Sequence, residues 1–329
     1  MAGPTAIGFY TRPIERRVMT GIDPPPTSVL LPTVRWTDAC DEVAGQLGPD
    51  DELLVICDTE ADPVADRDGR AGALPAGVRI VLAEEPTGCS GKSNAIAAGM
   101  EAAANDRIVW TDDDFDHPPE WLDRLHADYE RQGPTTERPA FVGLDPLGVL
   151  LEPAYLIGGT LPVAVGGIVW GGAVIFERDD VDEPAFLADL RRSLSDDGTL
   201  SEHLDVTAAD RTRVVPAGGS IGESLERFVR FVWITRYYAP RATAFNVVLA
   251  VVTAAACLVA PLPVVGLLTI VSAATYGRVG VRRPTFLLAG PAVLATPPLL
   301  AYALGRRTFV WGGRRYRWNA KYDVDVLGR

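Results

Sequence analysis

The chain has 329 residues, enough for one large domain or two ordinary ones. Its 43 acidic residues outnumber its 31 basic ones, which gives a net charge of −12 and argues against general nucleic-acid binding, because that function requires a basic face. The four cysteines form no C-x-x-C pair and the three histidines show no metal-ligand spacing, so the sequence predicts neither a disulfide framework nor a zinc site.

The first 27 residues contain arginines and a run of three prolines, but no apolar segment of the kind that forms the core of a signal peptide. We therefore expect an N-terminal arm over residues 1–27. We also expect the soluble part that follows it to stay in the cytoplasm.

Strand-like and helix-like segments alternate over residues 28–217. Helices are predicted at 37–47 and 90–106, and buried strands at 28–32, 52–58, 78–84 and 107–114. Such alternation predicts a mostly parallel α/β sheet, in which ligands bind beyond the carboxyl ends of the strands. Asp58 and Asp112–Asp114 follow two of these strands.

The segment Gly91-Lys92-Ser93 resembles the end of a phosphate-binding P-loop. In the motif G-x-x-x-x-G-K-[ST], however, the first glycine would stand at position 86, which is Pro86. Proline has no N–H to offer a phosphate. A P-loop nucleotide hydrolase is therefore disfavoured, and Lys92 needs another role.

The carboxylates at the strand ends repel one another unless a positive charge lies between them. Mg²⁺ or Mn²⁺ that carries a diphosphate would supply that charge, because such ions combine one or two carboxylates with phosphate oxygens. The alternative is a solvated acidic turn before a helix that begins at Pro118 or Pro119.

Residues 242–304 contain only three charged side chains, Arg278, Arg282 and Arg283. Stretches of about 20 uncharged, mainly apolar residues are long enough to cross a bilayer. We therefore predict two or three membrane spans here, in preference to buried helices of a large soluble core. An amphipathic interfacial helix is expected over 222–241, and the basic, aromatic tail over 305–329 suits a membrane interface.

An ordered set of motifs carries a family resemblance over residues 28–240. It comprises ELLVICD, GKSNAIAAG, IVWTDDDFDHPPEWL, VWGGAVIFE, LSDDGTLSEHL and RFVRFVWITR. The set resembles the membrane-bound family 2 glycosyltransferases of the GT-A fold, in particular the ceramide glucosyltransferase-like branch. The fold class expected from this resemblance is α/β, with a Rossmann-like, mostly parallel sheet followed by transmembrane helices.

The resemblance implies a nucleotide-sugar site at the sheet edge. Asp114 would be the direct metal ligand, with Asp112 as the other acid of the DxD motif and Mg²⁺ or Mn²⁺ as the ion. In the family, the acid after the second strand contacts the nucleotide base or ribose, which assigns that part to Asp58. The expected donor-binding residues are Asp58, Lys92, Asp112, Asp113, Arg227 and Arg230.

The catalytic acid of the family falls in the segment SLSDDGTL, where Asp197 corresponds to the general base and Asp196 to its acidic neighbour. An acceptor hydroxyl is a poor nucleophile and needs a base, and adjacent acids can raise each other's pKa. A second interpretation, compatible with the first, is that these residues cap a helix N-terminus.

The expected acceptor site is less sharply defined. Gly171 and Gly172 would let sugar and acceptor approach closely, although an ordinary tight turn explains them equally well. The sequence departs from the family at Phe231, where a tryptophan follows the second arginine in relatives. The expected acceptor-binding residues are Trp170, Gly171, Gly172, Phe231 and Trp233.

The sequence thus predicts an inverting hexosyltransferase with its catalytic domain over 28–221 on the cytoplasmic side of the cell membrane. It would use a UDP- or GDP-sugar, bind no nucleic acid and act on a membrane lipid. One alternative is a polysaccharide synthase, which should have an intact QxxRW motif and more spans. The other is a catalytically silent, glycosyltransferase-like membrane protein, which loss of Asp114 or Asp197 would have favoured.

Overall fold

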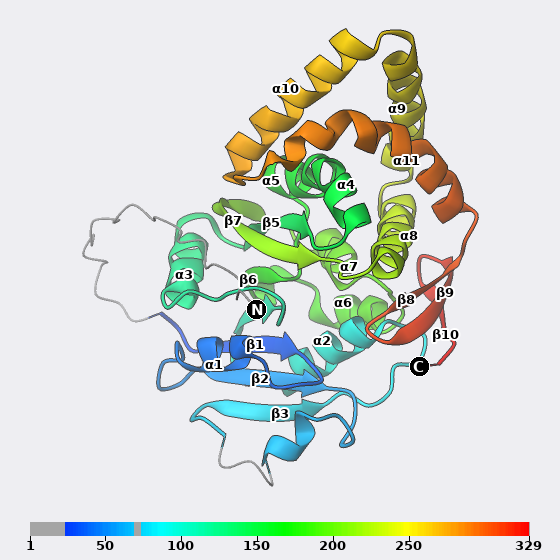
Figure 1. Cartoon of the computed structure of the whole chain (residues 1–329). Coiled ribbons are helices and arrows are strands. Elements are labelled where there is room, and N and C mark those ends of the chain that lie inside the picture. The colour runs from blue at the N-terminus through cyan, green and yellow to red at the C-terminus, as the bar shows by residue number, and fades with distance from the viewer. Residues whose placement is uncertain (1–23, 69–73, 329) are drawn as a thin grey trace, which may run out of the picture.

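The computed structural model describes residues 24–68 and 74–328, so most of the predicted N-terminal arm lies outside the described residues. A seven-stranded sheet forms the centre of the molecule, in the order β3-β2-β1-β4-β6-β5-β7 (Figure 1). Its strands are β1 (Thr27–Pro32), β2 (Glu52–Cys57), β3 (Val78–Leu82), β4 (Arg107–Thr111), β5 (Thr135–Gly143), β6 (Ala173–Glu177) and β7 (Thr207–Ala217).

The sheet is mostly parallel, as predicted. Strands β1 to β4 are parallel to one another and β5 is parallel to β7, whereas β6 runs antiparallel to both β4 and β5. All four strands expected from apolar runs are present. Strands β1, β2 and β4 are buried along almost their whole length, which explains why they are continuously apolar instead of alternating.

Successive side chains of the central strands enter two different cores. Val29 and Leu31 belong to one hydrophobic cluster, and Leu30 belongs to the other, because neighbouring residues of a strand point to opposite faces. Ile96 and Met100 of α2 pack in the second cluster, on the face that the sequence predicted. The helices of this part are α1 (Asp38–Ala44), α2 (Gly91–Ala102), α3 (Trp121–Gln132), α4 (Pro146–Tyr155), α5 (Leu161–Gly166), α6 (Glu183–Leu190) and α7 (Asp196–His203), with short helical turns at η1 (Ala65–Asp68), η2 (Leu156–Thr160) and η3 (Arg178–Asp180).

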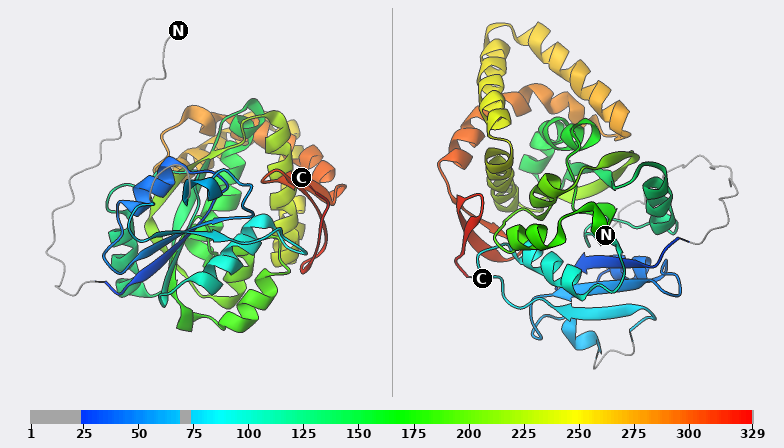
Figure 2. Two further views of the ribbon diagram at one scale, coloured as in Figure 1. Left: turned by 90° about the horizontal axis from the view of Figure 1, so that it is seen from below. Right: turned by 180° about the vertical axis from the view of Figure 1, so that it is seen from behind.

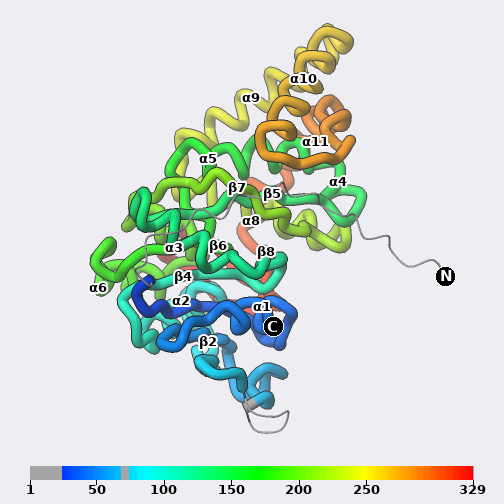
Figure 3. The backbone as a smooth tube through the Cα atoms, turned by 90° about the vertical axis from the view of Figure 1, so that its left-hand side faces the viewer, coloured from blue at the N-terminus to red at the C-terminus, as the bar shows by residue number. Residues whose placement is uncertain are grey.

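Four C-terminal helices follow the sheet. The C-terminal helices are α8 (Ile221–Tyr238), α9 (Pro240–Val259), α10 (Pro261–Val279) and α11 (Ala289–Leu304), the last preceded by η4 (Pro284–Leu288). Helices α9 and α10 project away from the sheet as a hairpin, and α11 crosses its base (Figures 1 and 3). In the described part of the chain, the segments long and apolar enough to cross a membrane are 146–166, 240–259, 261–279 and 284–304.

The first of these segments was not anticipated from the sequence. Residues 146–166 comprise α4, η2 and α5. This segment packs against β5 and α11, and 44% of its most apolar 18-residue stretch is buried. The hairpin is far more exposed. Only 17% of the most apolar 18-residue stretch of α9 is buried, and the side chains of Val259 and Leu262 at the hairpin tip are 85% and 87% exposed.

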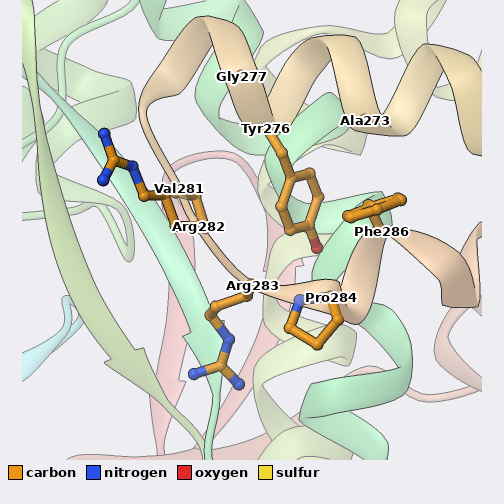
Figure 4. A pocket seen from close by; sticks show the side chains of 8 residues that line it. All are labelled: Ala273, Tyr276, Gly277, Val281, Arg282, Arg283, Pro284 and Phe286. Carbon is orange, nitrogen blue, oxygen red and sulfur yellow. The ribbon is translucent and has the colours of Figure 1, made fainter. Parts of the chain in front are cut away.

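The base of the hairpin carries arginines and is fixed to the sheet domain. A hollow of about 390 Å³ lies between the end of α10 and η4, and its lining includes Tyr276, Phe286, Arg282 and Arg283 (Figure 4). Arg283 also pairs with the fully buried Glu152 of α4, with Nε 3.1 Å from the carboxylate. This ion pair ties the link after α10 to the sheet domain.

The tail forms a second, three-stranded antiparallel sheet with β8 (Thr308–Trp311), β9 (Arg314–Ala320) and β10 (Asp323–Val326). It lies against the side of the sheet domain, remote from the hairpin tip (Figure 2). Phe309, Tyr316 and Trp318 are at most 2% exposed and join the main hydrophobic core. The tail is therefore a folded part of the sheet domain's core, and its placement at a membrane interface stays a prediction.

Candidate active site

A lysine and two carboxylates from three elements meet at the carboxyl edge of the sheet. Lys92 lies in the first turn of α2, Asp112 directly follows β4, and Asp196 begins α7. The Lys92 Nζ is 2.6 Å from Asp112 Oδ1 and 3.2 Å from Asp196 Oδ2. Residues that are far apart in the sequence thus form one charged cluster, the acid cluster, in which we also include the neighbouring Asp114 and Asp197.

The first turn of α2 explains how Lys92 reaches the acids. Ser90 caps the helix by accepting a hydrogen bond from the Ser93 N–H at 3.0 Å. Burial by itself would lower the pKa of Lys92, but Asp112 and Asp196 outweigh it and raise that pKa above its usual value. The lysine is therefore a fixed cation between carboxylates, a role that requires no P-loop.

Asp112 is the acid most affected by this environment. Burial raises its pKa to about 7, with Asp114 and Asp196 acting in the same direction and Lys92 acting against it. Burial is the main cause of this raised pKa, and the nearby charges of Asp114 and Asp196 add to it. A further cation at this position would favour the ionised form of Asp112.

Asp197 is held by the start of its own helix. Its Oδ1 accepts hydrogen bonds from Ser195 Oγ at 2.5 Å and from the Gly198 N–H at 2.7 Å. Burial, and next the charge of Asp196, raise the pKa of Asp197. Capping and a catalytic role are compatible, because only one of the two carboxylate oxygens has these partners among the described residues.

Two arginines of α8 face the acid cluster. Burial lowers the pKa of Arg230 to about 10, against the opposing effect of Asp197, Asp196 and Asp112, and burial also lowers the pKa of Arg227. The Arg227 guanidinium lies 5.4 Å and that of Arg230 5.5 Å from the ring centre of Phe231. Helix α8 thus carries two guanidinium groups beside the Phe231 ring, and both are close enough to the acids to feel their charge.

Asp113 and Asp114 occupy different surroundings from Asp112. Asp113 accepts a hydrogen bond from Thr33 Oγ1 at 2.5 Å, and both acids line an acidic hollow of about 280 Å³. Among residues 24–68 and 74–328, no three His, Cys, Asp or Glu side chains converge as a ready-made metal site.

The predicted acceptor residues divide into two groups. A Cβ at Gly171 would lie 2.6 Å from Asp196 Oδ2, and one at Gly172 would lie 2.3 Å from the Trp170 ring, so both glycines are needed for packing beside the acids. Trp233, by contrast, is 4% exposed and donates its indole N–H to the carbonyl of Ala303 at 3.1 Å. Its ring is thereby committed to contacts with α11.

Sequence reasoning missed the C-terminal sheet as part of the site. Trp311 lies against the Arg230 guanidinium at 4.1 Å, so an aromatic from β8 contacts an arginine whose own helix carries Phe231 in place of tryptophan. Arg314 of β9 pairs with Asp58 at 2.7 Å. The signal was the alternation in RRYRW (314–318), where 314, 316 and 318 are buried and the arginines between them are exposed.

Comparisons with known proteins give the family of one segment. Residues 38–141 match the glycosyl transferase family 2 profile, a range that includes Asp58, Lys92 and Asp112–Asp114 and ends before α7 and α8. None of the curated proteins compared with the chain matches it.

Solved structures with a similar arrangement include glucosyl-3-phosphoglycerate synthase from Mycobacterium tuberculosis. This structure is 18% identical with a TM-score of 0.40, over 64% of this chain and 80% of that one. The same synthase in complex with Mn²⁺, UDP and glucosyl-3-phosphoglycerate is 17% identical with a TM-score of 0.36, over 58% and 70% of the two chains. On the strength of the matched segment, residues 38–141 are a glycosyltransferase family 2 domain, and the chain is an enzyme of the glycosyltransferase class.

Proposed function

We propose that the protein is an inverting, metal-dependent glycosyltransferase that moves a sugar from a nucleotide diphosphate to a membrane lipid. The observation that carries this proposal is the cluster of Lys92, Asp112 and Asp196 at the sheet edge, faced by the two arginines of α8. Such a site has cations for a diphosphate and carboxylates for a metal and for a proton.

The donor would lie along the carboxyl edge of the sheet. Asp58 follows β2, where it would contact the base or ribose, and Asp113 follows β4 and accepts a hydrogen bond from Thr33, the residue after β1. Lys92, Arg227 and Arg230 would neutralise the diphosphate, since arginine offers paired N–H donors to phosphate oxygens.

Mg²⁺ or Mn²⁺ fits the acids of the DxD motif. Asp114 is exposed at the acidic hollow and Asp112 has an elevated pKa, so both would gain from a nearby cation. When bound, the ion would act as a Lewis acid that stabilises charge on the leaving diphosphate. Asp112 and Asp114 follow β4, whereas Asp197 lies in the first turn of α7, so different elements hold the metal-binding carboxylates and the general base.

Asp197 is assigned as the general base. It would take the proton from the acceptor hydroxyl, whose oxygen then bonds to the anomeric carbon from the face opposite the diphosphate. The bond from that carbon to the phosphate oxygen breaks, and the electron pair leaves with the nucleoside diphosphate. One displacement inverts the anomeric configuration. Lys92, held between Asp112 and Asp196, would balance negative charge beside the base.

The lipid acceptor is proposed from the exposed apolar surface. Val259, Leu262 and Leu258 at the hairpin tip are at least 75% exposed, which a water-facing surface does not favour. Phe231, Trp170 and the adjacent glycines would receive the lipid's hydroxyl at the acid cluster. Arg282 and Arg283 at the hairpin base would lie at the level of the lipid headgroups if the hairpin enters the bilayer.

The fold also supports a membrane arrangement. The C-terminal sheet packs on the catalytic domain, so both must lie on the same side of a bilayer, which we propose to be the cytoplasmic side of the cell membrane. Because crossings must then be even in number, α9 would lead into the membrane and α10 back, while α11 lies along the interface (Figure 1).

The decisive experiment is a donor screen with detergent-purified protein, Mn²⁺, UDP- and GDP-sugars and extracted membrane lipids. The expected product is a glycolipid, identified by mass spectrometry, that is missing when Asp197→Asn replaces the wild type. Transfer only to water-soluble acceptors would contradict the lipid acceptor, and a polymeric product would favour a polysaccharide synthase. Nucleotide binding without any transfer would favour the catalytically silent alternative.

A further inference from the structure

The C-terminal sheet touches the proposed donor site at two points. Strand β9 points Arg314, Tyr316 and Trp318 inward, whereas Arg315 and Arg317 are exposed on its other face. The inward residues come more than 200 positions after the strand-end acid and the helix that they contact. A family 2 domain over 38–141 therefore does not contain the whole of this edge of the site.

The Arg314 guanidinium contacts two carboxylates, that of Asp58 at the end of β2 and that of Glu85. Its Nη1 is 2.7 Å from Asp58 Oδ2 and its Nη2 is 2.5 Å from Glu85 Oε2. The side chains of Arg314 and Asp58 are only 5% and 7% exposed, so water screens this ion pair weakly. The planar guanidinium thereby holds the Asp58 and Glu85 carboxylates at fixed positions relative to each other, which a flexible ammonium would do less well.

The neighbouring contacts reach the helix that carries Lys92. The hydroxyl of Tyr316 accepts a hydrogen bond from the Gly91 N–H at 3.1 Å. A Cβ at Gly91 would lie 3.1 Å from Arg314 Nη1, so the glycine leaves room for the guanidinium. Strand β9 therefore contacts both Asp58 and the first turn of α2.

We propose that Arg314 is a positioning residue for donor binding, which holds the Asp58 carboxylate in the orientation that receives the nucleoside of the nucleotide-sugar. The inference rests on the proposed function, since it takes Asp58 as the nucleoside-binding acid. It makes the C-terminal sheet an integral part of the donor site, although the sheet follows the membrane helices in the sequence.

The contacts of the C-terminal sheet indicate that it stays attached to the rest of the protein and does not open when a donor binds. Tyr316, Trp318 and Phe309 are buried in the main core. The Tyr237 hydroxyl donates to the carbonyl of Asn319 at 2.8 Å, and the Val310 N–H donates to Glu226 at 2.9 Å. Opening the sheet to release Asp58 would expose these rings and break these bonds, so Arg314 stays in place while a donor binds.

The test compares Arg314→Met with Arg317→Met in the full-length, detergent-purified protein. Arg317 is a matched control because it lies on the exposed face of the same strand. Titration calorimetry with UDP or GDP in the presence of Mn²⁺ gives Kd, and turnover assays give donor KM and kcat. We expect Arg314→Met to raise Kd and KM at least tenfold with kcat changed less than threefold, and Arg317→Met to leave all three unchanged.

Arg314→Lys keeps the charge between Asp58 and Glu85 but lacks the fork, and it decides the matter if the methionine variant does not fold. We expect it to weaken nucleotide binding by several fold at an unchanged thermal midpoint. Wild-type affinity in a folded Arg314→Lys or Arg314→Met protein would overturn the inference alone. A wild-type protein that binds neither nucleotide would overturn the proposed function and this inference with it.

Discussion

The acid cluster and the α9–α10 hairpin depart from the usual distribution of side chains in opposite ways. At the sheet edge, charged groups such as Lys92 and Asp196 are largely withdrawn from water. At the hairpin tip, apolar groups such as Val259 and Leu262 are almost fully exposed. Soluble domains normally bury the second kind and expose the first.

Each departure costs free energy in the isolated chain, and each would be relieved by a different partner. Buried carboxylates need cations or hydrogen-bond donors, which a metal–diphosphate can supply. Exposed apolar helices need an apolar solvent, which a bilayer supplies. In both regions the side chains lack, in the isolated chain, the partner that would stabilise them, and we assign function to these regions. The following predictions test the two regions separately.

The largest effect is expected from Asp197→Asn. The carbonyl of asparagine cannot take up the acceptor's proton, and loss of a general base typically lowers kcat by about 10²–10⁴-fold. Nucleotide affinity should stay nearly normal, because donor binding rests on other residues. Asp196→Asn, with the milder defect, is the control. Turnover and anomeric NMR of the product measure both aspects, and near-normal turnover or retained configuration would contradict the mechanism.

The next effect concerns the metal. Asp114→Asn should lose most of its turnover, and chelation by EDTA should do the same to the wild type, because the leaving diphosphate then lacks its cation. Circular dichroism should show an unchanged fold in both cases. Full activity in EDTA would remove the metal from the proposal and leave only Lys92, Arg227 and Arg230 to bind the diphosphate.

Charges in the middle of the hairpin helices should change membrane attachment and leave the acid cluster intact. Val251→Asp combined with Ile270→Asp places one carboxylate near the middle of α9 and one near the middle of α10, at about 2.5–3.5 kcal/mol each at the bilayer centre. We expect these variants to be extracted by carbonate, while the wild type resists. Leu82→Asp on β3, also an exposed apolar site, is the control. Equal extraction of wild type and variants would contradict the anchor.

The smallest effect is a pH dependence of stability in the unliganded protein. Burial raises the pKa of Asp112 to about 7, whereas an unfolded aspartate has a pKa near 3.9. The folded state holds this proton more tightly, so the contribution is fully present below about pH 4 and is lost as the pH rises to about 7, at no more than about 1.4 kcal/mol per pH unit.

Thermal midpoints between pH 5 and pH 8 measure this contribution. The wild type should lose stability over that range more steeply than Asp112→Asn, and UDP with Mn²⁺ should restore the wild type at pH 8. Parallel pH profiles for the two proteins would show that Asp112 is not the titrating group.

Local patterns were sufficient to predict much of the catalytic part. The apolar runs that end at Cys57 and Thr111 are strands because a central parallel strand is buried on both faces, and that burial is visible in the sequence as continuous hydrophobicity. The acids after these strands, including Asp58 and Asp112, followed from the same reasoning. The apolar character of 242–304 was equally plain from its lack of charge.

Contacts between distant segments could not be obtained in this way. Nothing in the spacing of Lys92, Asp112 and Asp196 specifies that one ammonium lies between the two carboxylates, and Arg314 meets Asp58 across 256 positions. The sequence by itself determined strands β1 to β4, helix α2 and the apolar character of residues 242–304, because burial and lack of charge leave a local pattern. Only the tertiary structure decided which charges pair and where the tail lies, because those outcomes depend on packing surfaces contributed by separate elements.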